Sequence, residues 1–257
     1  MGPSLGAKAR RSASLGLDMA ARALFVRRAA GQPLPPVKKI YAVIGAGPPG
    51  SAAFRYAFVG QQTYDMILAI LLANDVDVEG AVLDFGCGSG RVIRWFRDHP
   101  YDVVGSDYNP HLIDWCRSHL QGFRFEVNGV DPPLAHPEGR FALVYAMSVF
   151  THLDEDRQRA WLRELRRITA AGGHLVVTTH GTRFWNALTP EERVRFDAGE
   201  AVVHMAESRV GSNIYSTFQS GDHFRAVVNG AELEVVDYIP WGAFGGRGQD
   251  LWLLRRS

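Results

Sequence analysis

The stretch AVLDFGCGSG (residues 81–90) determines the fold of this 257-residue chain. Its apolar start is typical of a buried strand that ends in Asp84, and Gly86, Gly88 and Gly90 follow in alternation. The next residues, RVIRWFRDH, place apolar side chains at helical spacing and predict a helix. Glycine lets the backbone approach a ligand closely, because no side chain stands in the way. The stretch therefore predicts a strand, a ligand-binding turn and a helix in succession.

The next apolar run, YDVVGSD, predicts a second strand that ends in Asp107. Carboxyl ends of neighbouring parallel strands meet at one edge of a sheet, so we expect Asp107 to lie beside the glycine turn. An acid in this position can accept both hydroxyls of a ribose. Together the two strands predict a pocket for a cofactor that contains adenosine.

Strand and helix patterns alternate beyond this point. FRFEVNG, FALVYAMS and HLVVTTH read as strands, and a helix is predicted from the N-cap Asp154 to the pair Gly172–Gly173. AELEVVDYI and DLWLLRR have no helix between them, so they predict an antiparallel hairpin at one edge of the sheet. The fold class is therefore α/β, a doubly wound sheet of seven strands that is mostly parallel.

Four segments divide the chain. Residues 1–36 form a basic N-terminal arm, partly disordered or helical, with a targeting peptide as the alternative. Residues 37–79, the lead-in, are predicted to be helical. The core spans 80–257, and 181–220 is an insertion in which TPEE predicts a capped helix. Because the insertion leaves the carboxyl edge of the fifth strand, we expect it to be a lid over the substrate.

Composition narrows the class of protein. The formal net charge is +1, which does not indicate nucleic acid as a partner. No run of about eighteen apolar residues appears, so the sequence predicts no membrane span, and we expect a cytoplasmic protein. The two cysteines, Cys87 and Cys116, form neither a disulfide framework nor a zinc spacing.

A second glycine cluster, VIGAGPPG (43–50), matches the dinucleotide fingerprint through Gly45, Gly47 and Gly50. That fingerprint also needs a following strand and an acid about twenty residues further on. No strand pattern follows here, which favours a simple turn. A flavin or nicotinamide oxidoreductase that uses this segment is the alternative.

The chain resembles the class I S-adenosylmethionine-dependent methyltransferases. DFGCGSG and GSDYNP resemble the first two motifs of that family, and VNGVDPPL resembles the segment that lines the adenine. FALVYAMSVFTHL and ITAAGGHLVVTT resemble the fourth and fifth strands with their flanking turns. The chain departs from the family pattern at Ala142 and Val130, where acids are common, so adenine recognition is expected to rely on backbone groups and packing.

The resemblance implies a Rossmann-like fold with S-adenosyl-L-methionine as cofactor and with Asp107 on the ribose. Asp84 is compatible with the ammonium group of the cofactor, and Arg91 with its carboxylate. The cofactor-binding residues that the resemblance implies are Asp84, Gly86, Cys87, Gly88, Gly90, Arg91, Asp107, Tyr108, Asn128, Gly129, Val130 and Met147. Cys87 also has a plainer interpretation, as a small residue that fills space in the turn.

His152 is the predicted general base, since it follows the fourth strand at the edge that faces the methyl group. The alternative is a histidine that packs against the next helix. Predicted substrate residues are His180, Tyr64, Asn213, Tyr215 and Trp241. No carboxylate cluster indicates a metal, although a divalent metal is compatible with the family.

The detailed patterns YAMSVFTHL and GSNIYSTF resemble a bacterial subgroup linked to saccharide and glycosyl modification. We therefore expect O-methylation of a hydroxyl on a saccharide or glycosylated metabolite. The expected partner is a small-molecule or oligosaccharide acceptor, and a homodimer is compatible with the sequence. The alternatives are the oxidoreductase and a methyltransferase-like module that binds without turnover.

Overall fold

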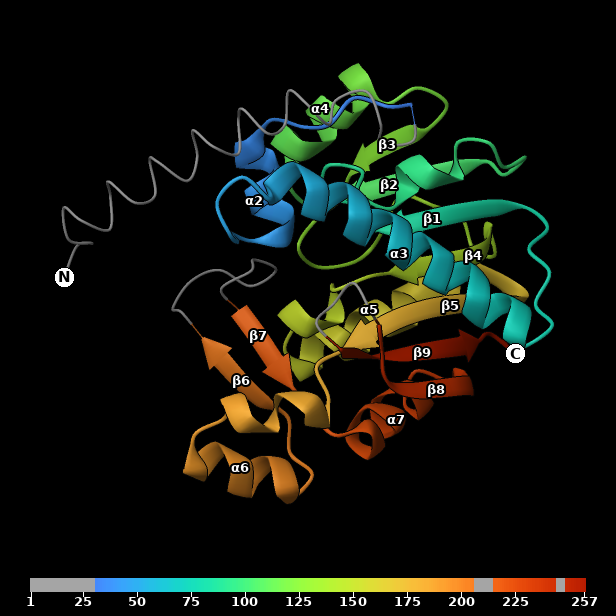
Figure 1. Cartoon of the computed structure of the whole chain (residues 1–257). Coiled ribbons are helices and arrows are strands. Elements are labelled where there is room, and N and C mark those ends of the chain that lie inside the picture. Colours follow the sequence, from blue (N-terminus) through green and yellow to red (C-terminus); the bar gives the residue numbers. More distant parts are fainter. Residues whose placement is uncertain (1–30, 206–214, 244–247) are drawn as a thin grey trace.

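The computed structural model describes residues 31–205, 215–243 and 248–257 (Figure 1). Most of the arm predicted over residues 1–36 lies outside these ranges, as does the targeting peptide considered for it. Within them, seven strands form one sheet in the order β3–β2–β1–β4–β5–β9–β8. The strands are β1 (Ala81–Phe85), β2 (Val103–Asp107), β3 (Arg124–Val127), β4 (Phe141–Ala146), β5 (Thr169–Thr179), β8 (Glu234–Ala243) and β9 (Gln249–Arg255).

The pairing of these strands confirms the predicted fold class. β1 to β5 pair in parallel, whereas β9 lies between β5 and β8 and is antiparallel to both. The neighbours β1 and β4 lie in the middle of the sheet, and the strand order runs outward from them in opposite directions. β2 and β3 lie beyond β1, and β5 lies beyond β4. In open α/β sheets a ligand binds at such a reversal, outside the carboxyl ends of the strands.

Helices cover both faces of the sheet (Figure 1). Side chains alternate along each strand, so Val82 packs on one face and Leu83 on the other. The first face is covered by α3 (Ala52–Ala73), η1 (Ile93–Phe96) and α4 (Pro110–His119), and the second by α5 (Glu155–Ile168) and α7 (Gly221–Asn229). Burial on both faces explains why the strands are almost continuously apolar.

The lead-in contains two helices, α2 (Val37–Ile44) and α3. The apolar run IYAVI belongs to α2, so the cluster GAGPPG joins two helices. A dinucleotide fingerprint needs a strand before its glycines. The oxidoreductase interpretation therefore lacks its structural basis, and the segment is the simple turn that the sequence favoured.

The helix predicted after the glycine turn is reduced to the short 3₁₀ helix η1. Buried side chains take the carbonyl oxygens that would begin an α-helix at this point. Arg94 Nε donates to the oxygen of Gly90 at 2.7 Å, and Tyr56 Oη donates to that of Ser89 at 2.7 Å. Arg94 Nη1 also reaches the oxygen of Pro33 at 3.1 Å. These bonds attach the lead-in to the glycine turn instead of extending a helix.

Replacing Arg94 with methionine is expected to lower the free energy of unfolding by about 3 kcal/mol, because buried hydrogen bonds to a charged group are lost and the carbonyls stay unpaired. The Arg94 side chain is fully buried. Urea unfolding of the variant measures the loss, and Arg97→Met, at an exposed position two residues after Trp95, is the control. Equal unfolding midpoints for both variants would contradict the role of Arg94.

A second difference concerns the end of α5. The sequence predicted a stop at Gly172–Gly173, but α5 ends at Ile168 and β5 begins at Thr169. Thr169 pairs with Phe141, and the register shifts before His174. Arg256 Nη1 donates to the oxygen of Thr169 at 2.7 Å, which removes a carbonyl that a further helical turn would need. The two glycines lie within β5, where φ of Gly172 is +74°.

Residues 181–220 contain η3 (Thr182–Ala187), α6 (Pro190–Asp197), β6 (Val202–Met205) and β7 (Tyr215–Phe218). The predicted capping box is present, since Thr189 N–H donates to Glu192 Oε2 at 2.8 Å and Glu192 N–H to Thr189 Oγ1 at 3.3 Å. The sequence did not predict the antiparallel pairing of β6 with β7. This pair forms a small second sheet beside the main one (Figure 1).

Candidate active site at the carboxyl edge of the sheet

A cavity of about 380 Å³ lies at the carboxyl ends of β1, β2 and β4. This volume is within the range of small-ligand pockets, and the position is the reversal point of the sheet. Among the predicted cofactor residues, the lining contains Gly86, Gly88, Asp107, Tyr108, Asn128, Gly129, Val130 and Met147. The predicted base, His152, lines the same cavity. We call this space the central cavity.

The glycine turn can only be built from glycine. Gly86 and Gly88 have φ of +77° and +56°, which disfavours other residues. A Cβ atom on Gly86 would lie 2.4 Å from Val149 Cγ2, and one on Gly88 would lie 2.8 Å from Val43 Cγ2. Val43 belongs to α2 and lines the central cavity, although the sequence did not single out this residue.

Asp107 ends β2 and both of its carboxylate oxygens accept backbone hydrogen bonds. Oδ2 accepts from Gly88 N–H and Oδ1 from Asn109 N–H, each at 2.8 Å. Burial raises the pKa of Asp107, and the two N–H bonds oppose that rise. Each carboxylate oxygen can accept a second hydrogen bond. The carboxylate therefore holds the glycine turn and keeps acceptor capacity for a ligand in the central cavity.

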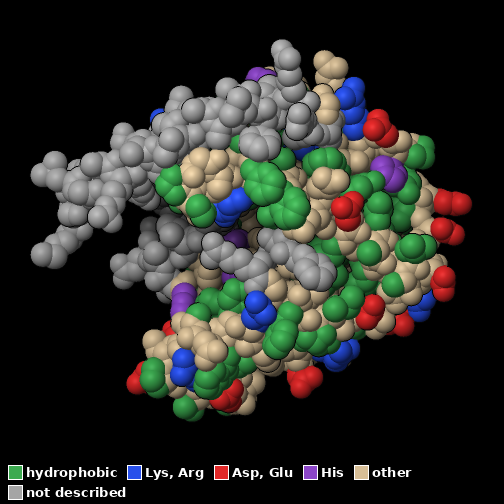
Figure 2. Space-filling view, in the orientation of Figure 1, with side chains coloured by type: hydrophobic (Ala, Val, Ile, Leu, Met, Phe, Trp, Pro, Cys, Tyr) green, Lys and Arg blue, Asp and Glu red, His purple; other side chains and the backbone are tan. Residues whose placement is uncertain are grey.

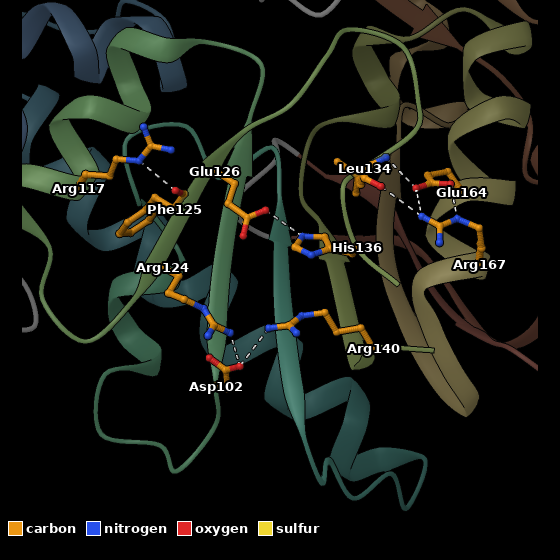
Figure 3. A network of polar contacts seen from close by, with 10 residues as sticks. All are labelled: Asp102, Arg117, Arg124, Phe125, Glu126, Leu134, His136, Arg140, Glu164 and Arg167. Carbon is orange, nitrogen blue, oxygen red and sulfur yellow. Dashed lines mark hydrogen bonds and ion pairs between the residues drawn. The ribbon is translucent and has the colours of Figure 1, made fainter. Parts of the chain in front are cut away.

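One wall of the cavity comes from residues 128–130, at the start of the long loop that follows β3. Figure 3 shows how polar contacts hold this loop. Leu134 N–H donates to Glu164 Oε1 at 2.8 Å, and Arg167 donates to both Leu134 O and the Glu164 carboxylate. Nearer the start of the loop, Trp161 Nε1 donates to the oxygen of Val130 at 3.0 Å. The loop is thus fixed to α5 at both places.

Four predicted cofactor residues lie behind the turn and not on the central cavity. Burial raises the pKa of Asp84 to about 7, although the Tyr145 hydroxyl and the Arg91 guanidinium lower it. Arg91 Nη1 donates to Thr63 Oγ1 of α3 at 3.1 Å. Cys87 is buried in the core, as the plainer interpretation expected, and Gly90 packs against Leu120. These residues support the turn from its core side.

His152 has a defined proton position. Its Nδ1 atom lies 2.5 Å from the backbone oxygen of Tyr215 in β7. A carbonyl oxygen only accepts, so Nδ1 carries the proton and Nε2 of the neutral ring keeps its lone pair. Burial lowers the pKa of His152, which favours this neutral form. The side chain on the cavity is therefore a hydrogen-bond acceptor and a base.

His180 stands next to His152. The two rings are perpendicular with centroids 6.4 Å apart, and His180 stacks on Phe218 at 5.0 Å. Burial is the main cause that lowers the pKa of His180 to about 3, and protonation of the neighbouring His152 would act in the same direction, so the His180 ring is neutral. His180 is not on the lining of the cavity, and it contacts the site through its neighbours.

The other predicted substrate residues are scattered. Tyr64 packs edge-on against Phe96 and bonds to His99, away from the cavity. Trp241 is half exposed and donates its Nε1–H to Thr182 Oγ1 at 3.3 Å. Asn213 lies outside the described residues. Tyr215 reaches the site with its backbone oxygen, while its ring is buried.

Figure 2 shows a hollow between the part of the surface formed by α2 and the part formed by β6 and β7. Ala42 and Val43 of α2 line the central cavity, as does His152, whose ring bonds to the backbone of β7. In the described ranges, no group of three or more His, Cys, Asp or Glu side chains is arranged to hold a metal ion. Of the described helices, none has the length and apolarity needed to cross a membrane.

An α/β fold with a glycine turn and a strand-ending acid on one cavity defines a nucleoside-cofactor enzyme. Residues 58–238 match the family described as "Methyltransferase domain". The match spans more than half of the chain, so the chain belongs to this methyltransferase family. Its methyl donor is S-adenosyl-L-methionine. The acceptor capacity of Asp107 fits the ribose hydroxyls of that molecule. The turn at Gly86 and Gly88 has no side chains, which fits a ligand lying close to the protein backbone.

Among curated proteins, the chain is similar to a malonyl-[acyl-carrier protein] O-methyltransferase of Salmonella typhimurium, with 26% identity over 133 residues. The alignment covers 51% of each, so the chain spans about half the length of the curated relative it matches.

Solved structures share the fold. The PH0226 protein from Pyrococcus horikoshii has 15% identity and a TM-score of 0.58, covering 77% of this chain and 91% of its own. The glycopeptide N-methyltransferase MtfA, complexed with S-adenosyl-L-homocysteine, has 16% identity and a TM-score of 0.57, covering 76% and 90%.

Proposed function

We propose that this methyltransferase transfers the methyl group to a hydroxyl oxygen of a saccharide or glycosylated metabolite, with His152 as the proton acceptor. The observation that carries the proposal is the neutral His152 ring on the central cavity, whose Nδ1 is held by Tyr215 O at 2.5 Å. A hydroxyl needs a base when it acts as nucleophile, and a positioned base contributes about 10²- to 10⁴-fold.

Within this proposal, Asp107 accepts the ribose hydroxyls, while residues 128–130 and Tyr108 border the adenine. Bound S-adenosyl-L-methionine supplies a methyl group on a positively charged sulfur, already activated for displacement. His152 Nε2 receives the proton of the acceptor hydroxyl. The Tyr215 carbonyl then stabilises the resulting imidazolium through the Nδ1–H bond.

The charge of the cavity supports a neutral acceptor. On the lining drawn from the described residues, Asp107 is the one acidic side chain and no Lys or Arg is present. A carboxylate acceptor would meet no cation among these described lining residues. A neutral hydroxyl needs only hydrogen bonds, which His152 supplies.

We further propose that residues 181–220 form a lid on the acceptor side and that residues 80–257 are the catalytic core. The contact between His152 and β7 supports this role, because movement of β7 would release the bond that orients the imidazole.

Two free, buried cysteines support the proposed cytoplasmic setting. The homodimer stays a prediction.

The test is release of S-adenosylhomocysteine from the purified enzyme with a panel of mono- and oligosaccharides, amines and carboxylates. Turnover with hydroxylated acceptors and none with carboxylates is the expected result. Turnover confined to amines would move the methylated atom to nitrogen. Donor binding without turnover of any acceptor would favour the non-catalytic module.

The pH dependence of turnover follows from the lowered pKa of His152. The active form is the neutral ring, so activity is present above this pKa and is lost as the pH falls through it. Since burial moves the pKa below the ordinary value of 6.5, we expect a flat rate from pH 7 to 8 and an acid limb below about 6.5. A profile of kcat against pH that keeps the same acid limb in His152→Gln would assign the limb to another group.

A further inference from the structure

A chain of three polar side chains runs behind the central cavity, and the proposed mechanism does not use it. Ser148 Oγ lies 3.0 Å from Gln249 Oε1, and Gln249 Nε2 lies 3.3 Å from His180 Nε2. Ser148 lines the cavity, whereas the other two are buried behind it, 6% and 9% exposed. The residues come from the ends of β4 and β5 and from the start of β9.

The backbone at Ser148 is strained. Its φ is +62°, in the left-handed region that a non-glycine residue seldom occupies. Such a conformation costs on the order of 1 kcal/mol or more and persists where the surroundings impose it. Ser148 N–H donates to Thr178 Oγ1 at 2.8 Å, which holds the residue in place. A glycine at this position would avoid the strain. What the serine adds over a glycine is its side-chain hydroxyl.

The direction of the hydrogen bonds is determined by chemistry. The amide oxygen of Gln249 only accepts, so the Ser148 hydroxyl donates to it. With the amide as the structure places it, its nitrogen only donates, so Nε2 of the neutral His180 ring accepts this bond. The remaining capacity of Ser148 Oγ is its lone pairs, and it can offer them to a molecule in the cavity. His152 Nε2 is a second acceptor on the same cavity.

We propose that Ser148 recognises a second hydroxyl of the acceptor molecule, with Gln249 and His180 as positioning residues. This proposal rests on the proposed function and narrows it to neutral acceptors that carry at least two hydroxyls. One hydroxyl donates to His152 and is methylated, and the other donates to Ser148. A mono-alcohol or an acceptor with a carboxylate at the second position lacks this donor.

The experiment compares methyl hexopyranosides (the α-D-gluco, manno and galacto forms) with their monodeoxy analogues. The variants are Ser148→Ala and Ser148→Gly, and the glycine variant removes the hydroxyl while it relieves the backbone strain. We expect KM to rise about tenfold for the best pyranoside in both variants, as for one lost hydrogen bond, with the affinity for S-adenosylhomocysteine unchanged. One deoxy analogue should show the raised KM in the unmodified enzyme and no further rise in the variants.

Gln249→Met tests the positioning role, since it keeps the side-chain length and removes the amide. It should raise KM for the same pyranoside, and the double variant with Ser148→Gly should show no further increase, because both changes remove one interaction. Equal KM values for Ser148→Gly and the unmodified enzyme on every pyranoside would overturn this inference alone. Absence of turnover with all pyranosides, with donor-product binding intact, would overturn the proposed function and this inference with it.

Discussion

Asp107→Ala should weaken the binding of S-adenosylhomocysteine about 100-fold, as measured by calorimetry, because hydrogen bonds to a charged group contribute about 1.5–3 kcal/mol each and tenfold in affinity is about 1.4 kcal/mol. Two effects combine in this variant. The proposed bonds to the ribose are lost, and Gly88 N–H loses its acceptor at 2.8 Å, which frees the glycine turn.

Two further variants make this test specific. Asp107→Asn keeps one acceptor oxygen, so its affinity should lie between those of the alanine variant and the unmodified protein. Asp114→Ala, on the exposed side of α4 where it pairs with Arg117 at 3.6 Å, should bind normally. Normal affinity in Asp107→Ala would place the nucleoside away from β2 and remove the basis of the proposed donor site.

His152→Ala should lower kcat by about 10²- to 10⁴-fold, the usual contribution of a positioned general base, while the affinity for the donor stays within about twofold. The cofactor contacts proposed for Asp107 and residues 128–130 do not involve this side chain. The loss should therefore fall on the chemical step. Single-turnover measurement with excess enzyme separates that step from product release.

The matched control for His152 is His174→Ala. His174 lies in the middle of β5, where it pairs with Leu143 of β4, and it is not on the lining of the central cavity. Burial also lowers its pKa. Its removal should leave kcat unchanged. Unchanged kcat in His152→Ala would exclude His152 from the mechanism and leave alignment of donor and acceptor as the main source of rate.

The sequence predicted features that depend on residues close together in the chain better than features that depend on distant residues. Asp107 lies beside the glycine turn because one β–turn–β unit contains both, and Gly88 and Asp107 are separated by only 19 residues. The helix after the turn was predicted wrongly, since its first carbonyls are bound by Arg94 and Tyr56. Tyr56 comes from another helix, and no local pattern records that contact.

The sequence by itself determined the fold class and the glycine turn beside Asp107, since periodic burial and glycine geometry are properties of neighbouring residues. Only the tertiary structure decided the part of the central cavity that is proposed to hold the acceptor. The proton position on His152 depends on β7, and Ser148 meets Gln249 across 101 residues of chain. Side chains from strands so far apart in the sequence become neighbours only when the sheet has assembled. The order of the strands in the sheet, and not their order in the chain, decides which side chains meet.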